Sequence, residues 1–452
     1  MKSRDESLEI IERALAAAAG DEADAVLCSV DRNISRFANS NLHQNMSEIS
    51  AELTLRVVAD SRIGVASTTG FEPEEIRRIA KLALDAARRG KPLPHFRGLV
   101  REAGSLADLP TFDEETASLP ILRKAESLRA VFDEGARRDV HFAGSWSTAS
   151  ASITTGNSHG LRRHAPLTFA DAVVIAGAGN GSGFATRIDR RASRVDLFTL
   201  AAEATEKATM LPGQTAVEIE PGAYDVILEP AALAEIFEWM NMITFSGQSY
   251  EDGSSFFVDH LGQRVVGENV SLADNPLDED FMPFPFDMEG VAKRQVLLIE
   301  EGVARTPVVD KVMSDRLGLP LTGHAAALGS EDHGTALHLS LAGGETTREE
   351  LIAGTERGIW VTRFHYLNGL LEPKTALMTG MTRDGTFLIE NGRVTRRLVN
   401  LRWTQPMIEA FSNITGLSRE RRGIGSWWNP IGGAIAPTVR IRDWKITGVQ
   451  KS

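Results

Sequence analysis

Cysteine is nearly absent from this chain of 452 residues, which contains only Cys28. One cysteine excludes disulfide bonds within the chain and any metal site built from several thiolates, and it suits a reducing compartment. Cys28 lies in the apolar run "ADAVLCSV", where a free cysteine is more often a small buried hydrophobic residue than a nucleophile. The sequence therefore gives no indication of thiol chemistry.

An excess of positive charge is also missing. The chain has 49 Lys and Arg against 61 Asp and Glu, which gives a net charge of -12 at pH 7. Nucleic-acid-binding proteins normally present a basic face to the phosphates, so we expect no nucleic-acid partner. Arg419, Arg421 and Arg422 form the main local exception, and three arginines on an acidic protein are usually solvated.

Long apolar runs are absent as well. No uninterrupted apolar stretch approaches the roughly 20 residues of a membrane-spanning helix. The first 20 residues read as an acidic amphipathic helix, without the apolar block and basic flank of a signal peptide. We therefore expect no membrane partner and a cytoplasmic location.

The hydrophobic content of 42% predicts a globular protein with a sizeable core, and the length favours more than one domain. The N-terminal segment alternates between helix and strand patterns, with alternating apolar residues at 49–59 leading into a hairpin turn. The predicted elements here are helix 5–19, strand 23–30, strand 49–59, a return strand from Ile63, and a helix over 73–89.

The same order of elements recurs further along the chain. A helix at about 114–137, an extended stretch, a strand at 167–179, its return and a helix at about 194–209 repeat the first pattern. The motif "ANS" around Asn39 matches "GNS" around Asn157. The number of residues between these two motifs is nearly the same as the number between Ile63 and Ser182, which begin a second pair of similar stretches. Chance matching of two short motifs is the alternative, but the shared order favours a duplication. The predicted N-terminal α+β domain spans 1–212, with diverged repeats at about 1–95 and 113–210.

A glycine-rich stretch at 177–183, "GAGNGSG", superficially resembles a phosphate-binding loop. It lacks the Lys-Ser/Thr ending of a P-loop, and a strand pattern follows it instead of a helix. We therefore expect these glycines to form a hairpin turn.

The remaining segment, 213–452, reads mostly as strands and turns after a Pro- and Gly-containing connection at 211–224. Helices are expected only at about 231–243, 347–357 and 405–412. The fold class is therefore α+β, with a C-terminal strand-rich antiparallel domain that is a sandwich or barrel-like.

Candidate catalytic residues are sparse. His333 and His338 are separated by an odd number of residues near a strand, which points their side chains to opposite faces. A metal site built from His324, Glu331, Asp332 and His333 stays an open alternative. No serine lies in the G-x-S-x-G frame of a nucleophile elbow. From the residues alone, no reaction is specified.

Several stretches, taken together, resemble the TldD/PmbA family, also called the modulator of DNA gyrase family. They run in order from residue 35 to residue 448 and so cover nearly the whole chain. These stretches are "SRFANSNLHQN", "LTLRVVADSRIGVASTTG", "SGQSYEDGSSFFVDHLGQRV", "PFDMEGVAKRQVLLIEEGV", "DRLGLPLTGHA", "MTRDGTFLIENG" and "PTVRIRDWKITG".

The resemblance implies an α+β N-terminal domain, a strand-rich C-terminal domain, and dimers that enclose a cleft for unfolded peptide. In the catalytic type, a helix carries HExxxH. Its histidines bind zinc, its glutamate activates water, and a later cysteine is a further ligand. In this chain that frame falls near Glu238, Trp239 and Ile243, and no histidine lies between residues 165 and 259.

The chain is therefore similar to the PmbA/TldE type, which lacks the zinc motif. This implies no catalytic residue and no cofactor in this chain, with zinc expected only in a catalytic partner. The first hypothesis is a non-catalytic subunit of a peptidase complex that acts on unfolded peptides. Its partner would be a TldD-type chain, a second copy of itself, or both. A self-sufficient metallopeptidase with an unrelated metal site is the second. The third is a peptide-binding or scaffolding homodimer.

Overall fold

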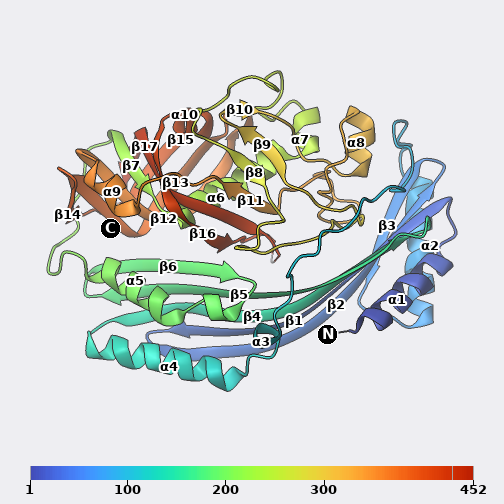
Figure 1. Cartoon of the computed structure of the whole chain (residues 1–452), viewed down its shortest axis with the longest axis horizontal. Coiled ribbons are helices and arrows are strands. Elements are labelled where there is room, and N and C mark those ends of the chain that lie inside the picture. Colours follow the sequence, from blue (N-terminus) through green and yellow to red (C-terminus); the bar gives the residue numbers. More distant parts are fainter. Residues whose placement is uncertain (1, 430, 451–452) are drawn as a thin grey trace.

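The computed structural model describes residues 2–429 and 431–450. A long antiparallel sheet from the N-terminal half forms the middle layer (Figure 1). Helices cover one face of this sheet, and the C-terminal half packs against the other (Figure 1). The predicted α+β class is confirmed.

The N-terminal sheet carries its strands in the order β3-β2-β1-β4-β5-β6. Its strands are β1 (Glu22–Ala38), β2 (Asn41–Ala59), β3 (Arg62–Thr68), β4 (His141–Asn157), β5 (Arg162–Ala178) and β6 (Gly181–Asp189). The helices that accompany it are α1 (Arg4–Ala17), α2 (Pro73–Arg89), α3 (Glu114–Ala117), α4 (Ile121–Arg137), η1 (Ala192–Arg194) and α5 (Leu197–Thr209). Within the described residues, no helix is both long and apolar enough to cross a membrane.

The strand order confirms the predicted duplication. Each repeat is a three-stranded antiparallel meander, and the two meanders join through β1 and β4, where Val30 lies opposite Ala151. The glycine-rich stretch forms the hairpin turn between β5 and β6, where Gly179 has a φ of 55°. That turn prediction is confirmed as well. The proposed boundary near residue 212 stays a prediction.

Two local predictions differ from the structure. The predicted helix over 114–137 is two helices, because Pro120 lacks an N–H and disfavours helical geometry at the residue before it. The strand predicted over 49–59 begins earlier, at Asn41. Its first ten residues are exposed on both faces, so they carry none of the apolar alternation on which the prediction relied.

In the C-terminal half, five strands close into a ring. β7 pairs with β12 on one side and with β17 on the other, and β13 and β15 complete the circuit. The barrel-like prediction is therefore confirmed, although the sheet is mixed because β7–β12 and β11–β17 run parallel. The strands are β7 (Gly222–Leu228), β8 (Leu272–Asp274), β9 (Val296–Glu300), β10 (Val303–Ala304), β11 (His338–Leu341), β12 (Arg357–Glu372), β13 (Leu377–Glu390), β14 (Arg393–Arg397), β15 (Leu401–Pro406), β16 (Ile414–Gly425) and β17 (Gly433–Val449).

The three predicted C-terminal helices are present with shorter bounds, and two further helices were too short to show a helical period. In chain order these helical segments are α6 (Pro230–Met240), η2 (Asn241–Phe245), α7 (Gly247–Glu251), α8 (Lys311–Leu317), α9 (Arg348–Ala353), η3 (Pro373–Thr375) and α10 (Met407–Ser412).

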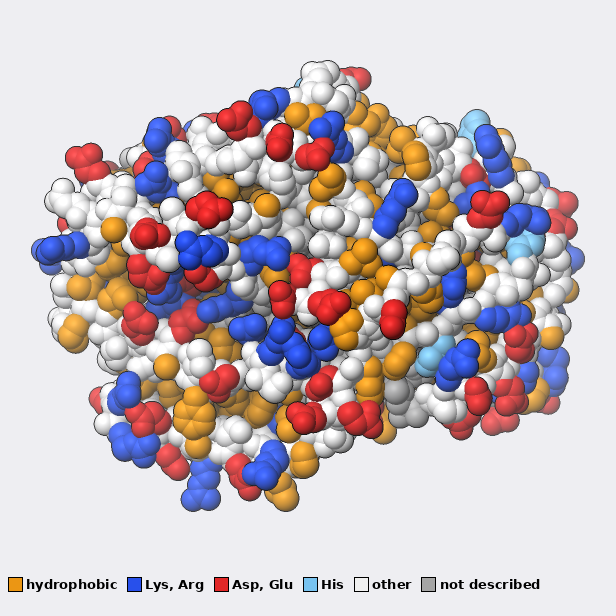
Figure 2. Space-filling view, viewed as in Figure 1, with side chains coloured by type: hydrophobic (Ala, Val, Ile, Leu, Met, Phe, Trp, Pro, Cys, Tyr) orange, Lys and Arg blue, Asp and Glu red, His pale blue; other side chains and the backbone are white. Residues whose placement is uncertain are grey.

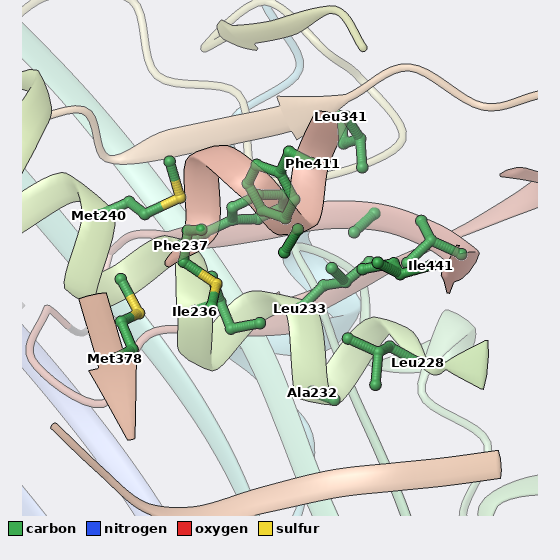
Figure 3. Packing of buried hydrophobic residues seen from close by; sticks show 14 of the residues in the cluster. Leu228, Ala232, Leu233, Ile236, Phe237, Met240, Leu341, Met378, Phe411 and Ile441 are labelled. Atoms are coloured by element: carbon green, nitrogen blue, oxygen red, sulfur yellow. The ribbon is translucent and has the colours of Figure 1, made fainter. Parts of the chain in front are cut away.

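Helix α6 is the central element of the largest hydrophobic core. Its apolar face packs toward β12, β17 and α10 (Figure 3). Burial of each large apolar side chain contributes roughly 1.5–3 kcal/mol, so this packing fixes the helix firmly. The α6 residues that Figure 3 labels are Ala232, Leu233, Ile236, Phe237 and Met240.

Charged side chains of both signs are interspersed on the face shown in Figure 2. The three neighbouring arginines noted in the sequence, Arg419, Arg421 and Arg422, likewise lie close to oxygen partners. Arg421 lies 3.1 Å from Asp278, Arg422 lies 2.8 Å from Glu203, and Arg419 donates to the carbonyl of Glu345. These cations are therefore already engaged within the chain.

A buried ion cluster ties the N-terminal sheet to the C-terminal half. Arg56 on β2 donates to both oxygens of Asp24 on β1, at 2.9 and 2.5 Å. Its third nitrogen lies 2.9 Å from a carboxylate oxygen of Glu289. All three side chains are almost fully buried, so each charge depends on its partners in place of water.

We expect Arg56→Ala to lower the free energy of unfolding by about 3–5 kcal/mol, because it leaves the buried Asp24 carboxylate without its counter-ion. Urea unfolding followed by circular dichroism would measure the change. Arg62→Ala, which removes a partly exposed arginine 3.8 Å from Asp60, is the matched control and should cost less than about 1 kcal/mol. Equal effects of the two substitutions would contradict the role of the cluster.

Candidate functional site

The candidate site lies along α6, whose first turn is anchored by a buried carboxylate. Glu229 precedes Pro230, which suits the first helical position because it needs no hydrogen bond to its nitrogen. The Glu229 carboxylate accepts from Lys207 of α5 at 2.6 Å and from the indole of Trp360 at 3.1 Å. The start of α6 is therefore held by both halves of the chain.

A cavity of 510 Å³ opens beside the C-terminal end of α6. Its walls come from α6 and η2, from residues between 326 and 339, from Leu370, and from Ser426, Trp428, Asn429 and residues 432–434. Apolar and aromatic side chains line it together with backbone groups and a few polar side chains. This composition is typical of ligand sites.

Glu238 places a carboxylate in this cavity. It accepts a hydrogen bond of 2.6 Å from the backbone N–H of Trp427. Burial raises the pKa of Glu238, while hydrogen bonds from Ser426 and Trp427 oppose that rise. The carboxylate therefore holds the connection between β16 and β17 against the helix.

Two tryptophans mark the cavity rim. Trp239 on α6 meets Trp428 edge to face, with ring centroids 6.5 Å apart and planes at 80°. Trp428 is 70% exposed and Trp427 80% exposed, which is unusual for such large apolar side chains. Exposed aromatic rings at a cavity mouth offer contact area to a bound chain.

The helix changes geometry at the cavity. After Met240 it continues as one π-helical turn, a feature that is frequent at functional sites. Asn241 in this turn donates to the carbonyl of Ala336 at 2.8 Å and accepts from its N–H at 3.0 Å. This pair of bonds fixes the opposite wall of the cavity to the helix.

A second cavity of 790 Å³ lies between the N-terminal sheet and the C-terminal half, and both cavities are lined by Ser426. Side chains of β1 and β5 form one side, while α6, β12 and the residues after β16 form the other. Its charged lining residues are Arg32, Arg36, Asp171, Glu235, Arg363 and Arg383.

Two carboxyl groups of the second cavity have pKa values raised above those of ordinary carboxyl groups. Burial raises the pKa of Glu235 to about 7; Glu238 adds to this rise and Arg363 opposes it. Burial likewise raises the pKa of Asp171 to about 6, against the opposing charge of Arg32. Near neutral pH, Glu235 is partly protonated and can donate a hydrogen bond to a ligand, and Asp171 can do so in mildly acidic solution.

Two family models match this chain. The model of the PmbA/TldA metallopeptidase C-terminal domain matches residues 221–448, which is half of the chain, and that of the PmbA/TldA metallopeptidase domain 1 matches residues 23–87. The chain belongs to the PmbA/TldD metallopeptidase family.

Individual relatives agree with this assignment. The metalloprotease PmbA of Escherichia coli O157:H7 is 24% identical over 76% of this chain and 75% of its own length. A metalloprotease of Methanothermobacter thermautotrophicus is 24% identical, and the matched region spans 56% of each chain.

Solved structures show the same fold. TldE from Thermococcus kodakarensis has a TM-score of 0.86 at 19% identity, covering 98% of this chain and 99% of its own. A candidate modulator of DNA gyrase from Thermotoga maritima has a TM-score of 0.83 at 20% identity, covering 97% and 100%. At these identities the likeness concerns the fold alone.

Glu238, Trp239 and Ile243, which the family resemblance places at the zinc motif, do not together provide the ligands of a zinc ion. Glu238 and Trp239 face the first cavity, whereas Ile243 is buried in the hydrophobic core. Of the three, only the Glu238 carboxylate has a lone pair suited to a metal, and it already accepts a backbone hydrogen bond. One carboxylate is far from the three protein ligands of a catalytic zinc site.

The structure does not gather the alternative metal ligands into one site. His324 is buried, with Nε2 2.9 Å from Asp274 and Nδ1 3.0 Å from the carbonyl of Thr322. His333 instead pairs with Asp310 at 2.9 Å, while Glu331 and Asp332 are exposed. Across residues 2–429 and 431–450, no three His, Cys, Asp or Glu side chains lie close enough to hold a metal.

Several cavity residues had no sequence signal. Trp427 and Trp428 lie in a short connection, and Arg36 and Asp171 come from strands distant in sequence from α6. Only Glu235, which lies within the helix predicted over 231–243, could have been selected in advance. It lies one turn before Glu238, so the two side chains project from the same side of the helix.

We expect Glu235→Gln to raise the melting temperature at pH 8 by about 1–2 °C and to leave it unchanged at pH 4. The raised pKa means that the contribution of Glu235 to stability is full below about pH 4.5 and is lost as the pH rises through about 7. Differential scanning calorimetry at both pH values would test this. Glu206→Gln, on the exposed side of α5, should show no such pH dependence, and a gain at pH 4 alone would refute the prediction.

Proposed function

We propose that this chain is a non-catalytic, PmbA/TldE-type subunit of a peptidase complex that acts on unfolded peptides. A TldD-type chain supplies zinc and catalysis, and this chain supplies part of the peptide-binding cleft. The observation that carries the proposal is the composition of α6. At the position of the family's zinc helix, it presents Glu238 and Trp239 to a cavity and has no imidazole.

The two cavities support a peptide ligand. The first offers apolar and aromatic surface, with Trp239 and Trp428 at its rim. The second adds arginines and protonatable carboxyl groups that can bond to peptide carbonyls and N–H groups. Ser426 lines both cavities, so the two cavities adjoin at the connection between β16 and β17.

The two alternatives remain distinct from this proposal. A self-sufficient metallopeptidase would need His324 and His333 to leave Asp274 and Asp310, the carboxylates that they contact here. A peptide-binding scaffold would bind peptide without ever supporting its cleavage. Metal content and cleavage therefore discriminate among the three.

The purified chain should hold no stoichiometric metal and should not cleave an unstructured peptide with or without added zinc. Elemental analysis and peptide mass spectrometry would measure this. Cleavage that appears on addition of a TldD-type chain from the same genome, beyond that of the added chain alone, would support the proposal. One tightly held metal with cleavage by this chain alone would establish the metallopeptidase alternative, and no cleavage in any mixture would favour the scaffold.

Glu238→Ala should leave cleavage by the reconstituted complex largely intact, because the carboxylate positions the connection between β16 and β17 and activates no water.

Trp428→Ala should weaken binding of a fluorescent unfolded peptide by about tenfold or more, since it removes an aromatic contact surface. Leu122→Ala, an exposed leucine on α4, is the control for Trp428. A loss of turnover in the Glu238 variant with assembly preserved would contradict its assigned role.

A further inference from the structure

Four arginines line the second cavity, the space of 790 Å³ between the N-terminal sheet and the C-terminal half. Arg32 and Arg36 come from β1, whereas Arg363 comes from β12 and Arg383 from β13. Guanidinium groups from two separate parts of the fold therefore face one space.

Arg36 has no counter-ion in this cavity. Its neighbours in register on the sheet are Gln44 of β2 and Ser145 of β4, and both are uncharged. The side chain is exposed, and no carboxylate of residues 2–429 and 431–450 forms a salt bridge with it. A guanidinium group at the wall of a cavity, with no carboxylate to offset its charge, attracts an anionic ligand.

Arg32 has an unused hydrogen-bond donor. It projects from the same face of β1 as Arg36, because the two are separated by an even number of residues. Its Nε is buried without an acceptor among the described residues, and its Nη2 lies 3.4 Å from the hydroxyl of Ser147. Glu48 lies opposite Arg32 on β2 but forms no salt bridge with it. A buried N–H without an acceptor is costly, so a ligand oxygen that accepts from it gains a favourable bond.

The arginines from the C-terminal half share a single carboxylate. Asp384 accepts from Nε of Arg363 at 2.8 Å and lies 3.8 Å from Nε of Arg383. The guanidinium group of Arg363 also lies over the ring of Phe184 on β6, 4.5 Å from its centroid. This stacking holds Arg363 in place across the cavity. One carboxylate thus offsets two guanidinium groups only in part.

The remaining carboxyl groups of the lining offset less positive charge than ordinary carboxylates. Burial raises the pKa of Glu235 to about 7 and that of Asp171 to about 6. A carboxyl group that holds a proton donates a hydrogen bond, as a guanidinium group does. The polar lining therefore offers mainly donors and positive charge, which suits an anionic acceptor.

We propose that the second cavity selects peptide ligands by their carboxylate groups, which its four arginines bind. The group is an Asp or Glu side chain or the C-terminal carboxylate of the ligand. A planar guanidinium group binds a carboxylate through two parallel hydrogen bonds, and the single oxygen of a peptide carbonyl does not offer this match. This selectivity rests on the proposed function, because it takes the ligand to be a peptide.

The charge of the whole chain does not produce such a preference. With a net charge of -12, the protein repels an acidic peptide at long range. A preference for carboxylates must therefore come from contacts inside the cavity, and substitution of a single cavity arginine should reveal it.

Four fluorescent versions of one unstructured peptide test the proposal. They carry either Glu or Gln at a central position and have either a free or an amidated C-terminus. Fluorescence anisotropy with the full-length chain should show that an added carboxylate tightens binding at least about fivefold. Arg36→Gln should abolish this preference and leave binding of the Gln, amidated peptide unchanged. Arg129→Gln, which removes an exposed arginine on α4, is the control of equal charge.

A preference for either carboxylate that Arg36→Gln removes would support the proposal and identify the group that is bound. Equal binding of all four peptides would overturn the selectivity and leave the proposed function intact. No binding of any peptide would contradict the proposed function as well. An equal effect of Arg129→Gln would reveal a general charge effect and also overturn the proposal. Circular dichroism checks folding, and Arg383→Gln is a second cavity variant for the same comparison.

Discussion

The buried ion cluster of Arg56, Asp24 and Glu289 is the constraint on which the rest of the structure depends. It joins the N-terminal sheet to a segment of the C-terminal half with almost no access to water. A buried charge that loses its partner is strongly destabilising, so the two halves are fixed in one arrangement. The cavity between them has a defined shape because this arrangement is fixed.

One side of α6 packs in the core, and the other side lines cavities. Its apolar side is part of the largest core, and its polar side separates two cavities. A helix packed this tightly can position Glu235, Glu238 and Trp239 without itself moving. The same scaffold can therefore serve a catalytic or a non-catalytic family member, depending on which side chains occupy its exposed positions.

The sequence predicts the parts of the fold that local patterns encode. The duplication, the hairpin at Gly179 and the helix that begins at Pro230 all follow from periodicity and turn residues. Ring closure by β7 could not be predicted, because the pairing of β7 with β12 and β17 joins segments distant in sequence. The polar first part of β2 and the rim residue Trp428 could not be predicted either. Both contact residues that are distant in sequence, and local patterns do not encode such contacts.

The carboxylate of Glu229 has a consequence for how the two halves of the chain can move. Lys207 of α5 and Trp360 of β12 both donate to it, and Arg348 lies 3.4 Å from it. Any hinge motion that widened the larger cavity at this end would separate Lys207 from its buried counter-ion. Such a motion would leave a buried charge without its partner, so the two halves resist separation at the position of Glu229.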